Sequence, residues 1–335
     1  LRFYLTKPED LPSQAAVLRS NEIYADPILD ISFKQLMGST DNDPVALSFL
    51  KTFVPDIHPN LLQRIQNTSV AIPALKRRGE SQTFMDFHVK SGSGEHYIVE
   101  MQAKRHVMFD ERALFYTCAT FSRQLEMQDF EKEGWYKLLK PVIAIQIVNY
   151  DSNRACGLKD ESAEDTLIDR VKNKPLGKNQ YIKDYVLTDK NSGQVIKYLR
   201  MIQIELPRSP APKFHIPGSA ESDAVWWMRL LKYASKCEKS EEQTFMKEAP
   251  VFFKEALERL KLDKWAAPMV TEYKKEKENM DNYSTVLSVE RSEGKIEGKV
   301  EMVKKMIIQG MDSTVIASIS EMSPKQIEEI RAGLK

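Results

Sequence analysis

The spacing of apolar residues predicts helices first, then strands, then helices again. Residues 24–53 carry apolar positions at helical spacing, and the polar run at residues 38–44 predicts a turn between two helices. Asp26 followed by Pro27 is typical of a helix start, because aspartate caps backbone amides and proline fits the first helical position. Residues 1–21 show little periodicity and predict an arm.

A β-hairpin is predicted next. Apolar and polar side chains alternate over residues 81–89, and residues 96–102 are rich in strand formers. The Gly/Ser run at residues 91–94 between them predicts the turn. His88 and His96 flank this turn, and we expect them at surface positions of the strands.

A helical pattern over residues 109–136 separates the hairpin from two further strands. Residues 141–150 form an apolar run broken by Gln146, as expected for a strand covered on both faces, and residues 198–206 predict one more strand. This order predicts a mixed α/β sheet with helices on its faces. The buried face of the helix is predicted to contain Leu114, Phe115, Cys118, Phe121 and Leu125.

The rest of the chain is expected to be helical. Prolines cluster in residues 207–217 and predict a linker or an extended edge, and helical spacing follows from residue 223 onward. Asp312 and Ser323 stand where caps of two short helices would lie. A short coiled-coil-like seam precedes these helices and consists of Ile296, Val300, Val303 and Ile307.

The patterns divide the 335-residue chain into four parts. We expect an N-terminal arm over residues 1–21 and an α/β core over residues 22–215. A helical region over residues 216–285 and a tail over residues 286–335, with a coiled-coil-like helix and a helix-turn-helix-like pair, would complete the chain. The length agrees with two domains of about 150 residues each.

Composition narrows the class of protein. Hydrophobic residues make up 42% and charged residues 29%, which favours a large core over disorder. Lys and Arg number 49 against 48 for Asp and Glu, which excludes a globally basic nucleic-acid coat but not local basic patches. The 3 cysteines lie far apart, which argues against a disulfide scaffold or a zinc ribbon. No apolar run approaches the ~20 residues of a membrane helix. We therefore expect a soluble, cytoplasmic protein.

Three polar residues stand within the apolar hairpin strands. Asp86 lies in the first strand, and Glu100 and Gln102 lie on one face of the second because side chains alternate along a strand. The hairpin can place Asp86 beside Glu100. Adjacent carboxylates repel each other unless a divalent cation holds them, so the pair indicates a metal site. The alternative is that both carboxylates face solvent from an exposed hairpin.

These residues belong to a longer series of motifs that includes FMDFHV at residues 84–89 and IVEMQ at residues 98–102. The other segments are residues 30–38, 112–116, 124–125, 134–136, 139–145 and 204–207. In this order, over about residues 22–210, the series resembles the PD-(D/E)XK nuclease-family transposases, or recombination-promoting nucleases. The resemblance implies a restriction-endonuclease-like mixed sheet flanked by helices, followed here by an all-helical C-terminal extension. It also implies hydrolysis of DNA phosphodiester bonds with Mg²⁺ or Mn²⁺.

The resemblance assigns roles to the strand residues. The motif aspartate falls on Asp86 and the E-x-K element on Glu100, Met101 and Gln102, which makes Asp86 and Glu100 the metal ligands. Gln102 replaces the lysine of the wider superfamily, as is usual in this branch, and offers only neutral hydrogen bonds. We expect Gln102 to position the attacking water. Lys104 could bring its ammonium into the site, or could be solvated.

Two pairs of residues, each on one face of a predicted helix, can be interpreted in two ways. Asp30 and Lys34 are four residues apart and form a surface ion pair, or Asp30 assists the metal and Lys34 contacts DNA. Arg112 contacts a phosphate with support from Tyr116, or the two hold their helix to the sheet. Basic residues near the hairpin are expected to contact DNA phosphates, or to be solvated loop residues. They are Lys76, Arg77, Arg78, Lys104 and Arg105.

The function that we expect is a metal-dependent DNA endonuclease linked to recombination or transposition, with DNA as partner and no membrane. The alternative is a catalytically inactive DNA-binding or protein-interaction module that retains the fold, because the motif lysine is absent. The tail over residues 286–335 has 8 basic and 8 acidic side chains, which favours packing or homo-oligomerisation over DNA binding.

Overall fold

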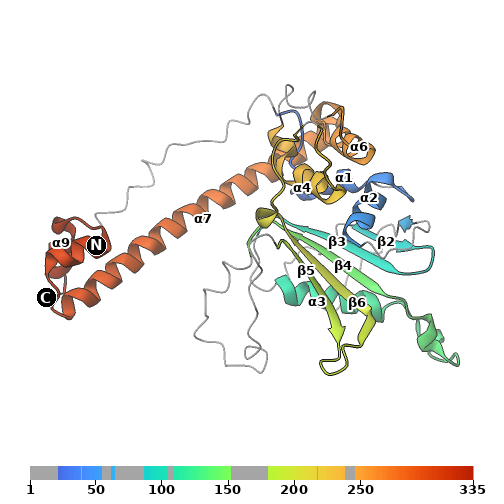
Figure 1. Cartoon of the computed structure of the whole chain (residues 1–335), viewed down its shortest axis with the longest axis horizontal. Helices are drawn as coiled ribbons and strands as arrows, with labels where there is room; N and C mark the ends of the chain where they lie inside the picture. The colour runs from blue at the N-terminus through green and yellow to red at the C-terminus, as the bar shows by residue number, and fades with distance from the viewer. Residues whose placement is uncertain are drawn as a thin grey trace. The chain divides into compact units, whose positions relative to one another are not determined.

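The computed structural model describes residues 22–38, 40–54, 62–64, 87–104, 109–151, 180–216, 218–237 and 246–334 (Figure 1). The chain divides into two compact units, of which one ends at Tyr273 and the other begins at Lys274. The four-part division expected from sequence stays a prediction.

A mixed sheet forms the centre of the first unit (Figure 1). Its strands, in spatial order, are β1 (Leu62–Arg64), β2 (Phe87–Ser91), β3 (His96–Gln102), β4 (Val142–Val148), β6 (Val195–Glu205) and β5 (Ile182–Thr188). Strand β4 runs parallel to β3 and β6, whereas the other pairs are antiparallel. The predicted α/β class, the hairpin turn and the buried strand β4 are confirmed. Strands β1 and β5 were not predicted, and β6 begins three residues earlier than expected.

One face of the sheet is apolar and supplies much of the core. Phe87, Val99, Ile145 and Ile202 lie side by side across four strands, and all are buried. The β-branched side chains suit a strand that is covered on both faces, and every residue of β4 is buried. This face holds the strands in register, because a slip by one residue would expose it.

Helices from distant parts of the chain pack together beside the sheet (Figure 1). They are α1 (Asp30–Met37), α2 (Pro44–Phe53), α4 (Asp223–Tyr233) and α6 (Val251–Arg259). The ring of Trp227 lies edge-on to Phe49 and is stacked on Phe252, both at 5.1 Å between centroids. Short 3-10 turns link this part of the chain, namely η6 (Leu206–Arg208), η7 (Ala234–Lys236) and η8 (Leu262–Lys264).

The predicted helix start at Asp26 and Pro27 is wrong, because α1 begins at Asp30. The backbone of this segment pairs instead with a segment far along the chain. The amide of Ala25 donates to the carbonyl of Leu260 at 2.8 Å. The Asp26 amide donates to the hydroxyl of Tyr273 at 3.0 Å. Such long-range bonds outweigh a local capping signal.

The helix predicted over residues 109–136 is also shorter than expected. Helix α3 (Phe109–Ser122) is followed by the 3-10 turns η3 (Met127–Asp129) and η4 (Trp135–Leu138). Its buried residues include Ala113, Thr117 and Thr120, whereas Leu114 and Phe115 are exposed. The predicted buried face was therefore wrong for Leu114, Phe115 and Cys118, which are exposed, whereas Leu125 and Phe121 are half-buried. Phe121 packs on Ile98, Val142 and Ala144 of the sheet.

The second unit contains the rest of α7 (Ala267–Ile308), with α8 (Ser313–Ser320) and α9 (Pro324–Ala332). Val303, Ile316 and Ile327 are fully buried and form its small core. The predicted caps are confirmed, since Asp312 accepts the amide of Thr314 and Ser323 accepts the amide of Gln326. In the predicted seam Val303 is buried, but Ile296 is 57% exposed.

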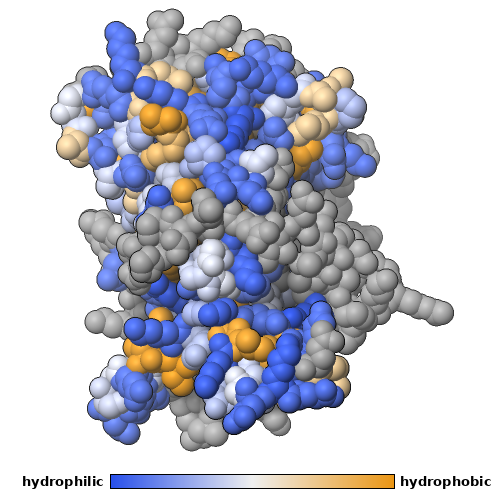
Figure 2. All heavy atoms as spheres, turned by 90° about the vertical axis from the view of Figure 1, so that its right-hand side faces the viewer, coloured by the Kyte–Doolittle hydropathy of each residue, from blue (hydrophilic) through white to orange (hydrophobic). Residues whose placement is uncertain are grey.

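The molecular surface is mixed in character. The face in Figure 2 is largely hydrophilic and carries separate hydrophobic patches. None of the described helices is long and apolar enough to cross a membrane.

Candidate active site

A row of polar side chains crosses the sheet on the face opposite the apolar row. Glu100 in β3 pairs with Gln146 in β4, and Gln146 pairs with Gln203 in β6. Paired residues point to the same face of a sheet, so these side chains lie side by side. Both glutamines are 2% exposed and Glu100 is half-buried. Ile98 and Ala144 lie two residues before Glu100 and Gln146 on the same strands, so their side chains point to the same face. Phe121 of helix α3 packs on both, and the helix therefore covers this face.

The Glu100 carboxyl has an unusual charge environment. Burial raises its pKa from 4.5 to about 7, and the nearby guanidinium of Arg112 limits the rise. A carboxyl with this pKa changes between its neutral and charged forms near neutral pH. Perturbed carboxyls of this kind cluster at functional sites, and here the shift coincides with a row of buried polar groups.

Gln102 and Arg112 form a direct contact beside Glu100. The Nη2 of Arg112 donates to the Oε1 of Gln102 at 2.8 Å. The Nε2 of Gln102 donates to the backbone carbonyl of Lys104 at 2.6 Å. The guanidinium of Arg112 also lies over the ring of Phe109 at 5.6 Å. The structure thus brings Glu100, Gln102 and Arg112 together, on β3 and on the first turn of α3.

A second polar cluster lies at the end of β6. The fully buried Glu205 pairs with Lys183 at 3.1 Å and with Arg208 at 3.7 Å. Gln203 Nε2 donates to Asp110 at 3.3 Å. Burial raises the pKa of Asp110, and the positive charge of Lys183 opposes this rise.

Sequence reasoning missed this second cluster. Its signal was the alternation of Gln203 and Glu205 with apolar residues, which repeats the pattern of Glu100 and Gln102. The side chains of β3 and β6 point to the same face because both strands pair with β4 in a fixed register. No local sequence pattern reveals this register.

The donors on this face suit a hard divalent cation. Within the part of the chain that the structure describes, Gln203 Oε1 is buried and has no hydrogen-bond partner. Mg²⁺ and similar ions take carboxylate and amide oxygens, and a cation would offset the burial of the Glu100 carboxylate. Among the described residues, no group of three or more His, Cys, Asp or Glu is placed to hold a metal ion. Asp86 lies outside the described residues. It directly precedes Phe87, the partner of Val99, and Glu100 directly follows Val99.

The other predicted residues are more dispersed. Asp30 and Lys34 form an ion pair at 2.7 Å on α1, with both side chains about half exposed. Tyr116 is half-buried on α3, with its ring edge-on to Phe115. Lys104 contributes its backbone carbonyl to Gln102. The predicted DNA-contacting residues outside the described part of the chain are Lys76, Arg77, Arg78 and Arg105.

The two hairpin histidines are not simple surface residues, contrary to expectation. His88 Nε2 and His96 Nδ1 are 3.1 Å apart, and both side chains are half-buried. Burial and the neighbouring His96 lower the pKa of His88 from 6.5 to about 4. His88 pairs with Ile98 and therefore lies on the same face as Glu100.

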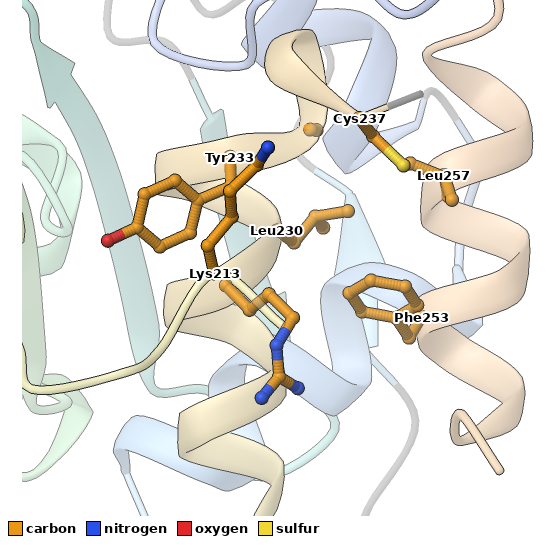
Figure 3. Close-up of a pocket in the computed structure, with 8 residues that line it drawn as sticks. Lys213, Leu230, Tyr233, Cys237, Phe253 and Leu257 are labelled. Carbon is orange, nitrogen blue, oxygen red and sulfur yellow. The ribbon is translucent and has the colours of Figure 1, made fainter. Parts of the chain in front are cut away.

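A small pocket lies elsewhere in this unit, between α4 and α6 (Figure 3). Its walls are mainly apolar and include Leu230, Phe253 and Leu257, with Lys213 and Cys237 at the side. It contains none of the polar residues of the sheet, so we place the candidate site at the Glu100 row.

Comparison with known proteins gives one family. Residues 27–178 match the model described as PD-(D/E)XK nuclease family transposase, which covers slightly less than half of the chain. The matched segment includes α1, α2, the hairpin, α3 and β4. The resemblance noted from the motifs is confirmed, and the mixed sheet flanked by helices agrees with this fold. Curated proteins and solved structures give no match.

Proposed function

From the assignment of residues 27–178 to the PD-(D/E)XK nuclease family of transposases, we propose that the chain is a metal-dependent DNA endonuclease that acts in recombination or transposition. The family supports a nuclease or transposition-related function. The observation that carries the finer proposal is the half-buried Glu100 carboxyl, whose pKa is raised to about 7, beside Gln102 and Arg112. A carboxyl that is partly withdrawn from water costs stability, and such costs are typical of functional sites.

We assign Glu100 and Asp86 to the metal. Phe87 of β2 pairs with Val99 of β3, Asp86 directly precedes Phe87, and Glu100 directly follows Val99. This order along two antiparallel strands supports one ion bound by both carboxylates. When bound, Mg²⁺ or Mn²⁺ supplies activation of water and stabilises charge at phosphorus. Glu100 must be ionised to act as a ligand, so the proposed activity rises with pH through the pKa of about 7.

DNA contacts are assigned to basic and polar residues around the site. Lys34, Lys104 and Tyr116 lie in the described part of the chain, and Asp30 is assigned an accessory role near the metal. The remaining contacts are assigned to Lys76, Arg77, Arg78 and Arg105. With a net charge of +1, the chain is expected to bind DNA weakly and with strong salt dependence.

A plasmid assay tests the endonuclease. Supercoiled plasmid is incubated with the protein in Mg²⁺, in Mn²⁺ and in EDTA. We expect nicking that EDTA abolishes and that Glu100→Gln and Asp86→Asn each reduce by at least roughly 100-fold. Asp184→Asn is the matched control, because Asp184 is a carboxylate in the same sheet on the opposite face, paired with Arg200. Cleavage that persists in EDTA, or in Glu100→Gln, would contradict the proposal.

The alternative function is a DNA-binding or interaction module without catalysis. The observation that favours it is Gln102 at the lysine position, with its amide bonded at both ends to the protein. Retention of DNA without any nicking, in either metal, would support this alternative.

We also propose that the C-terminal helices take part in homo-oligomerisation. Ile296 and Ile308 of α7 are 57% and 73% exposed, which leaves apolar surface along the helix. Light scattering of the full chain tests this. An oligomer that Ile296→Glu dissociates supports it, whereas a monomeric wild type contradicts it.

A further inference from the structure

The amide of Gln102 has a fixed orientation. Its Nε2 donates to the carbonyl of Lys104 at 2.6 Å, so its Oε1 faces the other way and accepts Arg112 Nη2 at 2.8 Å. One partner lies just beyond the end of β3 and the other on α3. The amide therefore links a strand end to a helix start, and its acceptor oxygen holds a cation.

Arg112 is the cation that acts on Glu100. Its guanidinium is the charged group that opposes the burial-driven rise of the Glu100 pKa. A guanidinium has five N–H donors, and Gln102 accepts one of them. The Nε of Arg112 is buried and has no hydrogen-bond partner among the described residues, and the ring of Phe109 lies against the guanidinium. The guanidinium is thus held by Gln102 and Phe109, and the hydrogen bond to Gln102 uses only one of its donors.

A lysine at position 102 would not fit this arrangement. Its ammonium would replace the acceptor oxygen that Arg112 now contacts at 2.8 Å. Two positive charges at about 4 Å repel by several kcal/mol at the effective dielectric of a partly buried site. Glutamine at position 102 and arginine at position 112 therefore depend on each other.

We propose that Gln102 and Arg112 act as one unit in place of the superfamily lysine. Arg112 supplies the positive charge to a phosphoryl oxygen of DNA, and Gln102 is a positioning residue that holds the guanidinium through its Oε1. This inference rests on the proposed nuclease function. It also changes the role expected for Gln102, which holds the guanidinium of Arg112 and not the attacking water. Lys104 contributes through its backbone carbonyl, which fixes the Gln102 amide.

A charge-relocation experiment tests the pair. The variants are Arg112→Met, Gln102→Lys and the double variant Gln102→Lys/Arg112→Met, which moves the cation from the helix to the strand. We expect each single change to lower the single-turnover nicking rate by roughly 100-fold. The double variant is expected to recover to within about tenfold of wild type, because it restores an E-x-K element without like-charge repulsion.

Controls separate this role from folding. Arg200→Met removes an arginine from the same sheet, on the opposite face, which is bonded to Asp184 at 2.7 and 3.0 Å. It is expected to change the rate by less than about threefold, as for a surface ion pair. Arg112→Lys keeps the charge and is expected to retain more activity than Arg112→Met. This variant keeps the test informative if Arg112→Met does not fold.

A second readout does not use catalysis. Binding of a fluorescent DNA duplex is measured in EDTA for the same variants. We expect Arg112→Met to weaken binding and the double variant to restore it, since one phosphate contact is lost and regained.

The outcomes distinguish the two proposals. If wild type nicks DNA but the double variant is no faster than the slower single variant, the inference is wrong and the nuclease function stands. If wild type never nicks DNA, the proposed function fails, and the same loss and recovery of binding in EDTA would still support the pair as a phosphate-binding unit. Binding that is unchanged in Arg112→Met contradicts the inference in either case.

Discussion

The two faces of the central strands carry opposite chemistry. On one face Val99, Ile145 and Ile202 lie side by side, each at most 1% exposed. On the other face, one residue further along each strand, lie Glu100, Gln146 and Gln203. In this second row, Gln146 Nε2 and Gln203 Oε1 are buried and find no hydrogen-bond partner in the described ranges of the chain. Such groups cost free energy, so one face provides stability and the other keeps polar groups that the fold alone does not need.

The largest loss of stability from a single substitution is expected on the apolar face. Ile145→Ala removes buried methyl groups from the centre of the sheet and should lower the free energy of unfolding by about 3 kcal/mol. Urea denaturation measures this loss. If Ile145→Ala lowered the free energy of unfolding by less than about 1 kcal/mol, the apolar face would not be the main source of stability.

Glu100 should make the stability of the protein fall as the pH rises from 4.5 to about 7. Its pKa is raised in the folded state to about 7 from 4.5, so the folded protein binds more protons between these values. The free energy of unfolding therefore falls by about 3 kcal/mol as the pH rises through this window. In metal-free buffer, Glu100→Gln should stabilise the protein at pH 8 and leave it unchanged at pH 4. Equal melting temperatures of the two proteins at pH 8 would refute this.

His88 should act in the opposite direction. Its pKa is lowered in the folded state from 6.5 to about 4, so the unfolded chain binds more protons in this range. Stability therefore falls as the pH drops from 6.5 to 4, by up to about 3 kcal/mol for full burial and less for this half-buried group. His88→Leu should reduce this acid-induced loss. Unfolding curves from pH 4 to 7 give the slope for both proteins.

The smallest change is expected at Gln146. Gln146→Leu removes a buried Nε2 that has no partner among the residues described and should stabilise the fold by about 1 kcal/mol. Gln203→Leu is the contrasting variant, because it also breaks the hydrogen bond to Asp110 and should not stabilise. Stabilisation of both variants by the same amount would contradict the assigned hydrogen bonds.

The sequence predicted what depends on local pattern. The hairpin and β4 follow from alternation, a Gly/Ser turn and an apolar run, and the common face of Glu100 and Gln102 follows from strand parity. The start of α1 was missed because the segment around Ala25 pairs with Leu260, far along the chain. The buried face of α3 was wrong in part, because Ala113, Thr117 and Thr120 are buried while the larger Leu114 and Phe115 are exposed.

The same limit applies to the candidate site. The contact between Gln102 and Arg112 needs the relative position of a strand and a helix, and the row from Glu100 to Gln203 needs the register of three strands. Neither is encoded in spacing alone. The half-buried state of His88 and His96 likewise depends on what covers the hairpin.

Binding of Mn²⁺ to the metal-free protein tests the central claim most directly. Calorimetry at pH 6, 7 and 8 is compared for wild type, Glu100→Gln and the control Asp184→Asn. Because a proton competes with the cation at a carboxyl whose pKa is about 7, the affinity of wild type should rise over this range. Glu100→Gln should lose binding and Asp184→Asn should retain it. Equal Mn²⁺ binding by wild type and Glu100→Gln would contradict a metal site on the polar face.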